Sequence, residues 1–345
     1  MSLSDRPVSR MSREVAEIPQ AAARLLDEGR ETIARVAAAL EMNSISHAVV
    51  SGRGSSGHAG THLRYLIETR LGLSAAPAAP SVVTRYGASP RLGEALYILI
   101  SQSGRSPDLV TAAEQATAAG AQTIAIVNDA NSPAARACRH VIPVAAGPEL
   151  AVAATKTVVN TMLAGLLLVA ALAEDEALVA ATQTAPERLS QALALDWSPW
   201  ARRLSPAPAG FVIGRGLSLG PAREAALKAA EVLGVPVLAY SAAEVLHGPK
   251  AAIRGEHPIL GLNAGGEVSD SIEDALATLA RQGSPVFSGS GPQPTLPGLG
   301  LGPGEPALDA VALLVPVYRA LEAEAARLGR NVDSPPGLLK VTETL

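Results

Sequence analysis

A serine-rich loop follows one of the most apolar stretches of the chain and has the composition of a phosphate-binding loop. It comes directly after residues 97–100 and contains Ser101, Gln102, Ser103 and Ser106. A helical pattern of apolar residues begins at Asp108, so these hydroxyls would lie at a helix N-terminus, where free backbone N–H groups bind anions. Such a loop suits a phosphate monoester, although the same serines could serve only as helix caps and turn residues.

A second loop of the same type follows the strand-like run at residues 47–51. It reads Gly52-Arg53-Gly54-Ser55-Ser56-Gly57 and leads into a helical pattern over residues 58–71. Its glycine spacing also fits a dinucleotide-binding fingerprint, but no acidic residue closes a following strand at the usual distance. Loops from adjacent strands of an open parallel sheet meet outside the carboxyl ends of the strands. We therefore expect both loops to face one phosphate group.

Groups suited to acid and base chemistry occur in the second half of the chain. Glu224, Lys228 and Glu231 are spaced four and three apart in a helical pattern over residues 221–234, so they share one helix face. A solvated stripe of ion pairs would show the same spacing. His247 follows closely and precedes a Gly-Pro turn. Its near-neutral pKa would suit proton transfer that opens a sugar ring.

The elements that must position these residues alternate between strands and helices, which predicts an α/β fold with a doubly wound parallel sheet. Strands are expected at residues 47–51, 81–85, 97–101, 122–127 and 140–143. Helices are expected at residues 12–40, 58–71, 108–119 and 155–173, with Pro19 near the start of a second N-terminal helix. Residues 197–209 contain three prolines and are expected to link two domains.

The second half repeats the pattern of the first, which indicates an internal duplication. A strand at residues 210–213 precedes Gly214-Arg215-Gly216, and further strands are expected at residues 235–240, 257–262 and 285–288. Where the first copy has the serine-rich loop, the second has Asn263-Ala264-Gly265-Gly266, which lacks hydroxyls. We therefore expect one phosphate site per chain.

Composition excludes several functions. The net charge of −4 and the aromatic content of 3% give no reason to expect a nucleic acid partner. Residues 163–172 are too short an apolar run to span a bilayer, and no signal peptide is recognisable. The single Cys138 fits a reducing compartment, which favours the cytoplasm. No cofactor and no metal site are expected, because His58 and His62 share a helix face without a third ligand.

Six motifs in the same order resemble the sugar-isomerase (SIS) half of glucosamine-6-phosphate synthases. They are the two loops above, the stretch from Glu149 to Lys156, the helix from Glu224 to Glu231, the segment from Glu244 to Pro249 and the tail from Val332 to Lys340. The resemblance implies two SIS domains, each a flavodoxin-like three-layer α/β/α unit. It places N-terminal helices at residues 1–40, the domains at 41–195 and 196–330, and a tail with an active-site lysine at 331–345.

The resemblance also implies roles for individual residues. A hexose 6-phosphate would be held through its phosphate by Ser55, Ser56, Ser101, Gln102, Ser103 and Ser106, and through its sugar by Val152, Ala153 and Ala154. Glu231 would move a proton between C1 and C2, with Lys228 and Glu224 orienting it. His247 would come from the neighbouring subunit of a homodimer and assist ring opening, and Lys340 would form or assist a Schiff base. Arg105 and Ala154 depart from the family pattern.

The synthases carry an N-terminal glutaminase domain, whereas here the SIS pattern begins almost at once. We therefore expect an amino-sugar phosphate isomerase or deaminase, which would convert glucosamine 6-phosphate to fructose 6-phosphate and ammonia. Two alternatives remain open. One is a deglycase of fructosamine-type phosphates, and the other is a sensor that binds a sugar phosphate without catalysis.

Overall fold

The computed structural model describes residues 8–299 and 304–340. The chain forms two compact units, each with its own parallel sheet. The five-stranded unit consists of Gln20–Glu149, Lys156–Ala185 and Leu339–Leu345, and the four-stranded unit of Met1–Pro19, Leu150–Thr155 and Pro186–Leu338. The chain therefore passes between the units several times.

The five-stranded sheet has the order β2-β1-β3-β4-β5, and all of its neighbouring strands are parallel. Its strands are β1 (His47–Ser51), β2 (Ser74–Pro77), β3 (Ala95–Ser101), β4 (Gln122–Val127) and β5 (His140–Pro143). The central strand β3 is buried along its whole length. Such burial is expected of a parallel strand with both faces covered, and it explains the unbroken apolar run in the sequence.

Helices flank this sheet, and two of them begin directly after the loops of interest. These two are α4 (Ser55–Leu66), which continues as a π-helical turn over Ile67–Leu71, and α6 (Pro107–Ala118). The others are α2 (Ile18–Arg24), a π-helical turn at Leu25–Gly29, α3 (Arg30–Ala39), α5 (Pro80–Thr84), α7 (Pro133–Ala137), α8 (Lys156–Leu172) and α9 (Glu176–Gln183). The expected position of Pro19 near the start of a helix is confirmed.

The strand expected at residues 81–85 is wrong. Residues 81–84 belong to the short helix α5, which Arg85 caps, and the edge strand that pairs with β1 is β2, a few residues earlier. Pro80 occupies the first turn of α5, where its fixed φ angle and missing N–H favour a helix start over a strand. The edge strand itself is rich in alanine and lacks the β-branched residues that mark strands.

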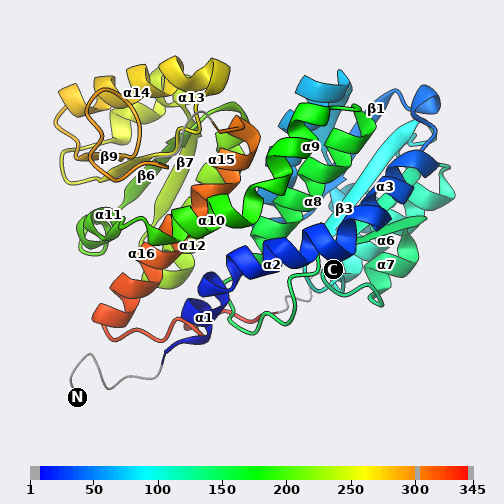
Figure 1. Ribbon diagram of the computed structural model, residues 1–345, viewed down its shortest axis with the longest axis horizontal. Helices are drawn as coiled ribbons and strands as arrows, with labels where there is room; N and C mark the ends of the chain where they lie inside the picture. Colours follow the sequence, from blue (N-terminus) through cyan, green and yellow to red (C-terminus); the bar gives the residue numbers. More distant parts are fainter. Residues whose placement is uncertain (1–7, 300–303, 341–345) are drawn as a thin grey trace. The chain divides into compact units, whose positions relative to one another are not determined.

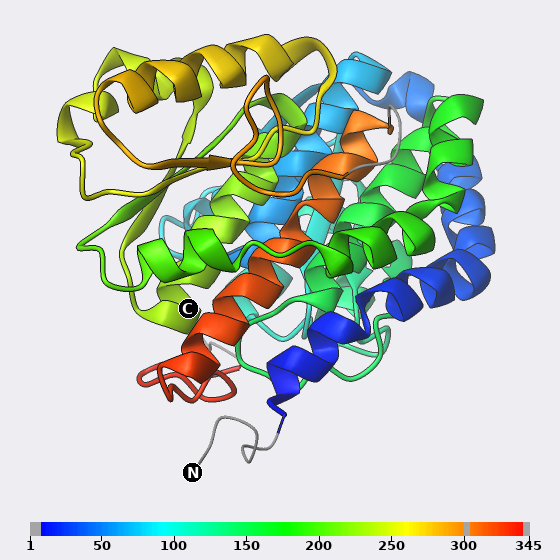
Figure 2. The ribbon, with the colours of Figure 1, turned by 60° about the vertical axis from the view of Figure 1, so that its left-hand side comes forward.

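The four-stranded sheet has the order β7-β6-β8-β9 and is also parallel. Its strands are β6 (Gly210–Gly214), β7 (Val237–Ser241), β8 (Ile259–Gly261) and β9 (Val286–Ser288). Its α-helices are α1 (Arg10–Ala16), α10 (Ala185–Ala194), α11 (Ser198–Leu204), α12 (Leu219–Leu233), α13 (Ala242–His247), α14 (Ser269–Arg281), α15 (Pro306–Ala312) and α16 (Leu314–Arg327). Helix α12 packs against α16 (Figures 1 and 2).

The two sheets share one topology, which confirms the duplication inferred from the sequence. In strand order, β7-β6-β8-β9 repeats β2-β1-β3-β4. The G-R-G sequence that follows β1 occurs again at the end of β6, where Gly214 is the last residue of the strand. Each repeat is an α/β layer structure with helices against its sheet, as the fold prediction requires.

The linker expected at residues 197–209 is wrong. Residues 198–204 form α11, whose Trp200 is fully buried, and the helix packs against α16 within the four-stranded unit. Pro199 lies in the first turn of α11, where proline is compatible with a helix.

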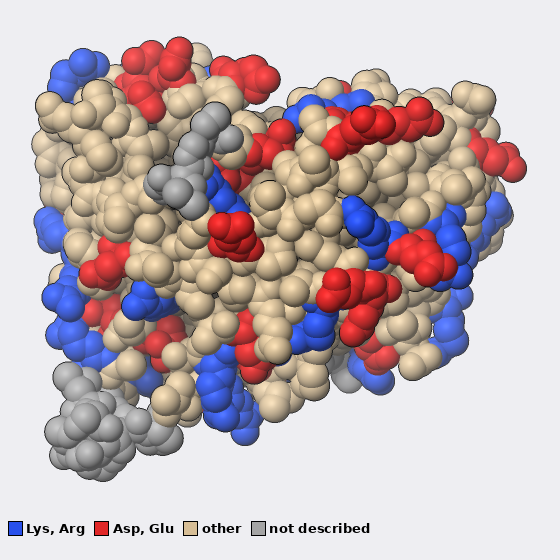
Figure 3. All heavy atoms as spheres, viewed as in Figure 1, with Lys and Arg blue, Asp and Glu red and all other residues tan. Residues whose placement is uncertain are grey.

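The described residues add two general observations. None of their helices has the length and apolarity that a membrane span requires. Lysine, arginine and acidic side chains are interspersed on the face drawn in Figure 3, without an extended patch of one sign.

Candidate active site

The two serine-rich loops leave neighbouring strands at the same edge of the five-stranded sheet. Strands β1 and β3 are paired in parallel, with Ser51 opposite Leu99. The loop after β1 ends where α4 begins at Ser55, and the loop after β3 ends where α6 begins at Pro107. The structure therefore places Ser55 and Ser56 on one helix start and residues 101–106 on the strand next to it. Two helix N-termini at one sheet edge provide the N–H groups that a phosphate needs.

The loop at residues 101–106 is shaped by its own hydroxyls. The Gly104 N–H donates to the buried Ser101 Oγ at 3.1 Å, and the Arg105 N–H donates to Ser103 Oγ at 3.3 Å. Ser106 is the N-cap residue of α6, yet its side chain makes no capping hydrogen bond. Helix capping therefore does not account for Ser106, which lies half-buried at the helix start beside half-buried Gln102 and Ser103.

Gly104 is required by the turn of this loop. Its φ angle is +63°, and a Cβ atom at this position would lie 2.1 Å from Ser132 Oγ. A side chain is thus excluded both by the backbone conformation and by the neighbouring loop.

An ion pair joins the two loops. The guanidinium of Arg53, in the loop after β1, contacts the carboxylate of Asp108, in the first turn of α6. The Asp108 side chain is fully buried, whereas Arg53 remains 45% exposed. The sequence analysis missed this pair. The available signal was the position of Asp108, in the first turn of a helix that follows a candidate phosphate loop. A carboxylate there would repel a bound phosphate unless a cation neutralised it, so a basic partner was to be expected.

Arg105, which departs from the family pattern, is held to one side. Its Nη2 lies 3.1 Å from Asp129 Oδ2 in the loop after β4. The guanidinium thus pairs with a carboxylate beyond the serine loop.

The three charged residues of α12 form a buried cluster. Lys228 Nζ contacts the Glu231 carboxylate and lies 3.5 Å from Glu224 Oε1. The Lys228 and Glu224 side chains are 1% and 0% exposed, and Glu231 is 20% exposed. The Tyr318 hydroxyl also donates to Glu224 Oε1 at 3.3 Å. This burial excludes the solvated stripe that the spacing allowed, because only Glu231 reaches solvent.

His247 is the last residue of α13 and is exposed on the four-stranded unit. Gly248 ends the helix, and Pro249 begins a 3-10 turn at Pro249–Ala252. The imidazole therefore lies at the surface of its own unit, between a short helix and a 3-10 turn.

The tail lysine is paired with a buried carboxylate. Lys340 Nζ lies 3.1 Å from Glu149 Oε2, and the Glu149 side chain is fully buried. Glu149 also accepts hydrogen bonds from the Thr157 backbone N–H at 3.1 Å and from Thr157 Oγ1 at 2.7 Å. The carboxylate thereby lies at the start of α8, where the helix dipole favours negative charge. In the sequence Glu149 was noted only as the first residue of a motif, and its pairing with Lys340 was not predicted.

The segment that contains Val152, Ala153 and Ala154 is irregular and is held through its backbone. The carboxylate of Glu14, from α1, accepts hydrogen bonds from the N–H groups of Leu150 and Ala151. The Val152 N–H donates to the Asp333 carbonyl at 3.4 Å. Ala153 is buried, whereas Val152 and Ala154 are half-buried. The sequence analysis did not single out Glu14.

The candidate residues thus fall into two groups. The phosphate loops, Glu149 and Lys340 belong to the five-stranded unit, and the α12 cluster, His247 and residues 152–154 belong to the four-stranded unit. In the part of the chain that the structure describes, no group of three or more His, Cys, Asp or Glu side chains could hold a metal ion.

Comparison with models of known protein families identifies the family of this chain. The SIS domain model matches residues 41–171 and 203–287, more than half of the chain. The chain belongs to the SIS domain family. The resemblance recognised in the sequence is therefore confirmed, including the two SIS-like repeats.

Curated relatives of this SIS protein include glutamine–fructose-6-phosphate aminotransferases (isomerizing). That of Methanothermobacter thermautotrophicus is 34% identical over 277 residues, which cover 79% of this chain and 46% of the relative. That of Symbiobacterium thermophilum is 33% identical over 259 residues, which cover 70% of this chain and 42% of the relative. The SIS protein spans about half the length of these relatives or slightly less.

Solved structures show the same architecture. A protein from Silicibacter pomeroyi DSS-3, provisionally named a phosphosugar isomerase, is 41% identical with a TM-score of 0.89, and the match covers 94% of this chain and 100% of that one. Glucosamine-6-phosphate deaminase from Thermotoga maritima shares the fold at 19% identity, with a TM-score of 0.74 and coverage of 97% of this chain and 100% of that one.

Proposed function

We propose that this SIS protein is a phosphosugar isomerase of the deaminase type, which converts glucosamine 6-phosphate to fructose 6-phosphate and ammonia. The observation that carries the proposal is the buried cluster of α12, in which Lys228 lies between two carboxylates and only Glu231 reaches solvent. Lys228 places a positive charge beside Glu231, the carboxylate that we assign as the base. The names of the Silicibacter pomeroyi and Thermotoga maritima proteins support the same reaction class.

In this proposal the substrate is anchored by its phosphate. The N–H groups at the starts of α4 and α6 and the side chains of Ser55, Ser56, Gln102, Ser103 and Ser106 bind the phosphate oxygens, while Ser101 holds the loop in shape. The 6-phosphate is remote from the reacting carbons, so its binding energy can position C1 and C2. The backbone of residues 152–154 contributes to sugar binding.

The chemistry is a proton shift followed by hydrolysis. After ring opening, Glu231 removes the proton from C2, which carries the amino group, and C1 gains a proton. The amine also loses one proton and the C1 carbonyl oxygen gains one, so C1 becomes a primary alcohol and C2 an imine. One water molecule then converts the imine to a ketone and releases ammonia. Glucosamine 6-phosphate and water therefore balance fructose 6-phosphate and ammonia without an oxidant or reductant.

His247 and Lys340 complete the proposed site. We assign ring opening to His247, contributed by the neighbouring subunit of a homodimer, since it is exposed on its own chain. Lys340 forms or assists a Schiff base with the open sugar, and its pairing with Glu149 fixes the position of the amine. We further propose that residues 41–195 and 196–330 are the two SIS domains, and that the protein works in the cytoplasm.

Incubation with glucosamine 6-phosphate in the absence of glutamine tests this function. Ammonia and fructose 6-phosphate are measured in one time course, and equal release of both is the expected result. Glu231→Gln should remove the activity, and Glu267→Gln, at an exposed position of the four-stranded unit, serves as the matched control. Binding of the sugar phosphate without release of either product would refute the deaminase proposal and favour a deglycase or a sensor.

A further inference from the structure

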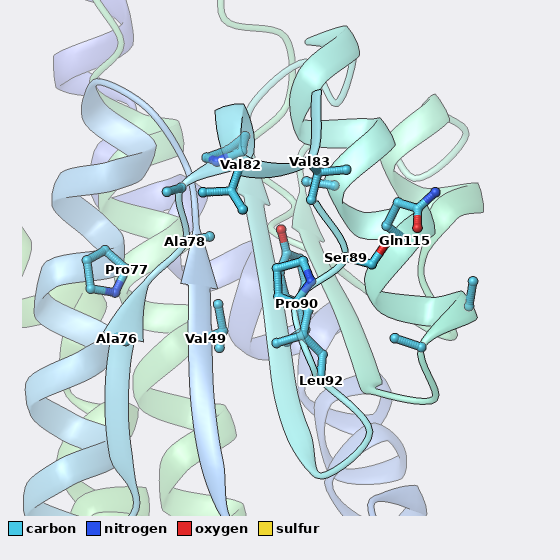
Figure 4. Close-up of a pocket in the computed structure, with 16 residues that line it drawn as sticks. Val49, Ala76, Pro77, Ala78, Val82, Val83, Ser89, Pro90, Leu92 and Gln115 are labelled. Atoms are coloured by element: carbon cyan, nitrogen blue, oxygen red, sulfur yellow. The ribbon is translucent and has the colours of Figure 1, made fainter. Parts of the chain in front are cut away.

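The five-stranded unit contains an apolar cavity that the proposed reaction does not use. It has a volume of about 390 Å³ and lies over one face of the sheet, between β1, β2 and β3 on one side and α5 and α6 on the other (Figure 4). Val49 and Ala76 line it from the strands, and Val82 and Val83 line it from α5. Gln115 of α6 and Ser89 are exposed at its rim.

The helix over this face of the sheet, α5, is short. This helix has only five residues, and the chain from Arg85 to Glu94 then returns to β3 without regular structure. A longer crossover helix would cover this face of the sheet, as α6 covers the neighbouring strands. The walls are mostly alanine, proline and valine, which have few rotamers and lose little conformational entropy when a ligand binds.

The second repeat shows what fills the equivalent place. Aligning Gly52-Arg53-Gly54 with Gly214-Arg215-Gly216 sets Val49 on Phe211 and Ser51 on Ile213. Tyr240 pairs with Ile213 across the sheet. In the first repeat the register ends with Val50 opposite Pro77, and Ala78, the next residue, corresponds to Tyr240. Phe211 and Tyr240 stack with ring centroids 6.4 Å apart, and Phe211 belongs to the core of its unit.

Two aromatic side chains of the second repeat are thus replaced by Val49 and Ala78 in the first, and both of these residues line the cavity. The first repeat therefore lacks two aromatic rings at the place where the second repeat packs Phe211 against Tyr240. The comparison of the two repeats therefore indicates that a ligand of this cavity is flat and aromatic.

We propose that this cavity binds a small, uncharged aromatic molecule. All of its lining residues are uncharged, so burial of an ionised group there would find no compensating partner. Its volume lies in the range of small-molecule sites. Tyr97 forms part of the wall, and the exposed Gln115 amide offers a hydrogen bond to one polar substituent at the rim. The inference does not depend on the proposed deaminase activity.

Calorimetric titration of the full chain with indole, a neutral aromatic probe, tests the proposal. One indole is expected to bind per chain, and indole-3-acetate, which adds a carboxylate, is expected to bind at least tenfold more weakly. The double variant V49F/A78Y rebuilds the aromatic pair of the second repeat, and it should abolish indole binding and raise the melting temperature.

Two further variants keep the test decisive if the double variant does not fold. Gln115→Trp at the rim should weaken indole binding at least tenfold, while Glu114→Trp, the adjacent exposed residue of α6 outside the cavity, should leave it unchanged. The proposal is overturned if no indole binds, if the Gln115→Trp and Glu114→Trp chains bind indole equally, or if indole-3-acetate binds as well as indole. Dissociation of a dimer by Gln115→Trp but not by Glu114→Trp would also overturn it, because the cavity would then be an interface between copies of the chain.

Discussion

Arg53 and Asp108 form an ion pair between the loop after β1 and the first turn of α6, with the carboxylate fully buried and the guanidinium half exposed. The pair ties the first turn of α6 to the loop before α4. Since both helix starts belong to the proposed phosphate site, one contact fixes the distance between the two halves of that site.

Arg53→Ala should lower both stability and phosphate affinity. The Asp108 carboxylate would remain buried without this cation, which costs about 1–3 kcal/mol in the free energy of unfolding. Urea unfolding and calorimetric titration with glucose 6-phosphate measure the two effects. Arg215→Ala, at the equivalent position of the second repeat, is the control. The R53A/D108A double variant should lose less than the sum of the single losses, and strict additivity would show that the pair is not coupled.

Glu231→Gln should abolish the exchange of the C2 hydrogen of glucosamine 6-phosphate with deuterium from solvent. The amide keeps the size of the side chain but cannot accept the proton. Binding of the sugar phosphate should stay within a few-fold of that of the parent chain, because the phosphate is held by other residues. NMR follows the exchange, and an unchanged rate would remove Glu231 as the base.

Ser103→Ala should weaken binding of hexose 6-phosphates by about 1.5–3 kcal/mol, the contribution of one hydrogen bond to a charged group. Ser81→Ala, at an exposed position of α5, is the control. Titration of both variants with glucose 6-phosphate gives the difference. A change of only a few tenths of a kcal/mol would mean that the phosphate binds elsewhere.

Gly104→Ala should destabilise the chain more than Gly87→Ala. Both glycines have positive φ angles, +63° and +61°, so both variants lose about 1–2 kcal/mol from the left-handed conformation. Only at Gly104 would the new Cβ collide with Ser132, whereas the space around Gly87 is open. The difference between the two unfolding free energies therefore isolates the steric collision, and equal losses would show that the loop can move aside.

Acid should remove the stabilisation provided by Glu324. Its two hydrogen bonds from Arg327, both 2.7 Å, are the main reason that its pKa lies below the ordinary value of 4.5, and Ser205 adds to the effect. A carboxylate with a lowered pKa stabilises the folded state above its unfolded pKa, and this stability is lost as the pH falls through the folded value. Glu324→Gln should therefore be less stable than the parent at pH 7, and urea unfolding should show the difference shrinking below about pH 4.5. A difference independent of pH would contradict this assignment.

The sequence correctly predicted the strands whose apolar residues form an uninterrupted run between two turns. Strands at 47–51, 122–127 and 140–143 have the predicted bounds, because each is a short run rich in β-branched residues between turns. The β-branched run at residues 81–85 has the same composition but follows Pro80, and its helical start overrode its strand propensity. Local composition could not reveal which of these effects would prevail.

The candidate site was predictable only in part, for a related reason. Loops at the carboxyl ends of parallel strands can be located from the strands alone, so the serine loops were found. The partner of Lys340 lies 191 residues away in the sequence, at Glu149, and Glu14 reaches Ala151 across 137 residues. Such contacts arise from tertiary packing, and no spacing rule connects them.

The four-stranded unit is built from segments that lie before and after most of the five-stranded unit in the sequence, and this has a consequence for folding during synthesis. Almost all of the five-stranded unit lies between Gln20 and Ala185, so it can fold while later residues are still being translated. Helix α1 is synthesised well before α16, against which it packs and which ends at Arg327. At a translation rate of about 5–20 residues per second, α16 is synthesised on the order of 15–60 s after Met11 and Val15, the buried apolar residues of α1. During this interval these apolar side chains lack the helix that covers them in the finished fold.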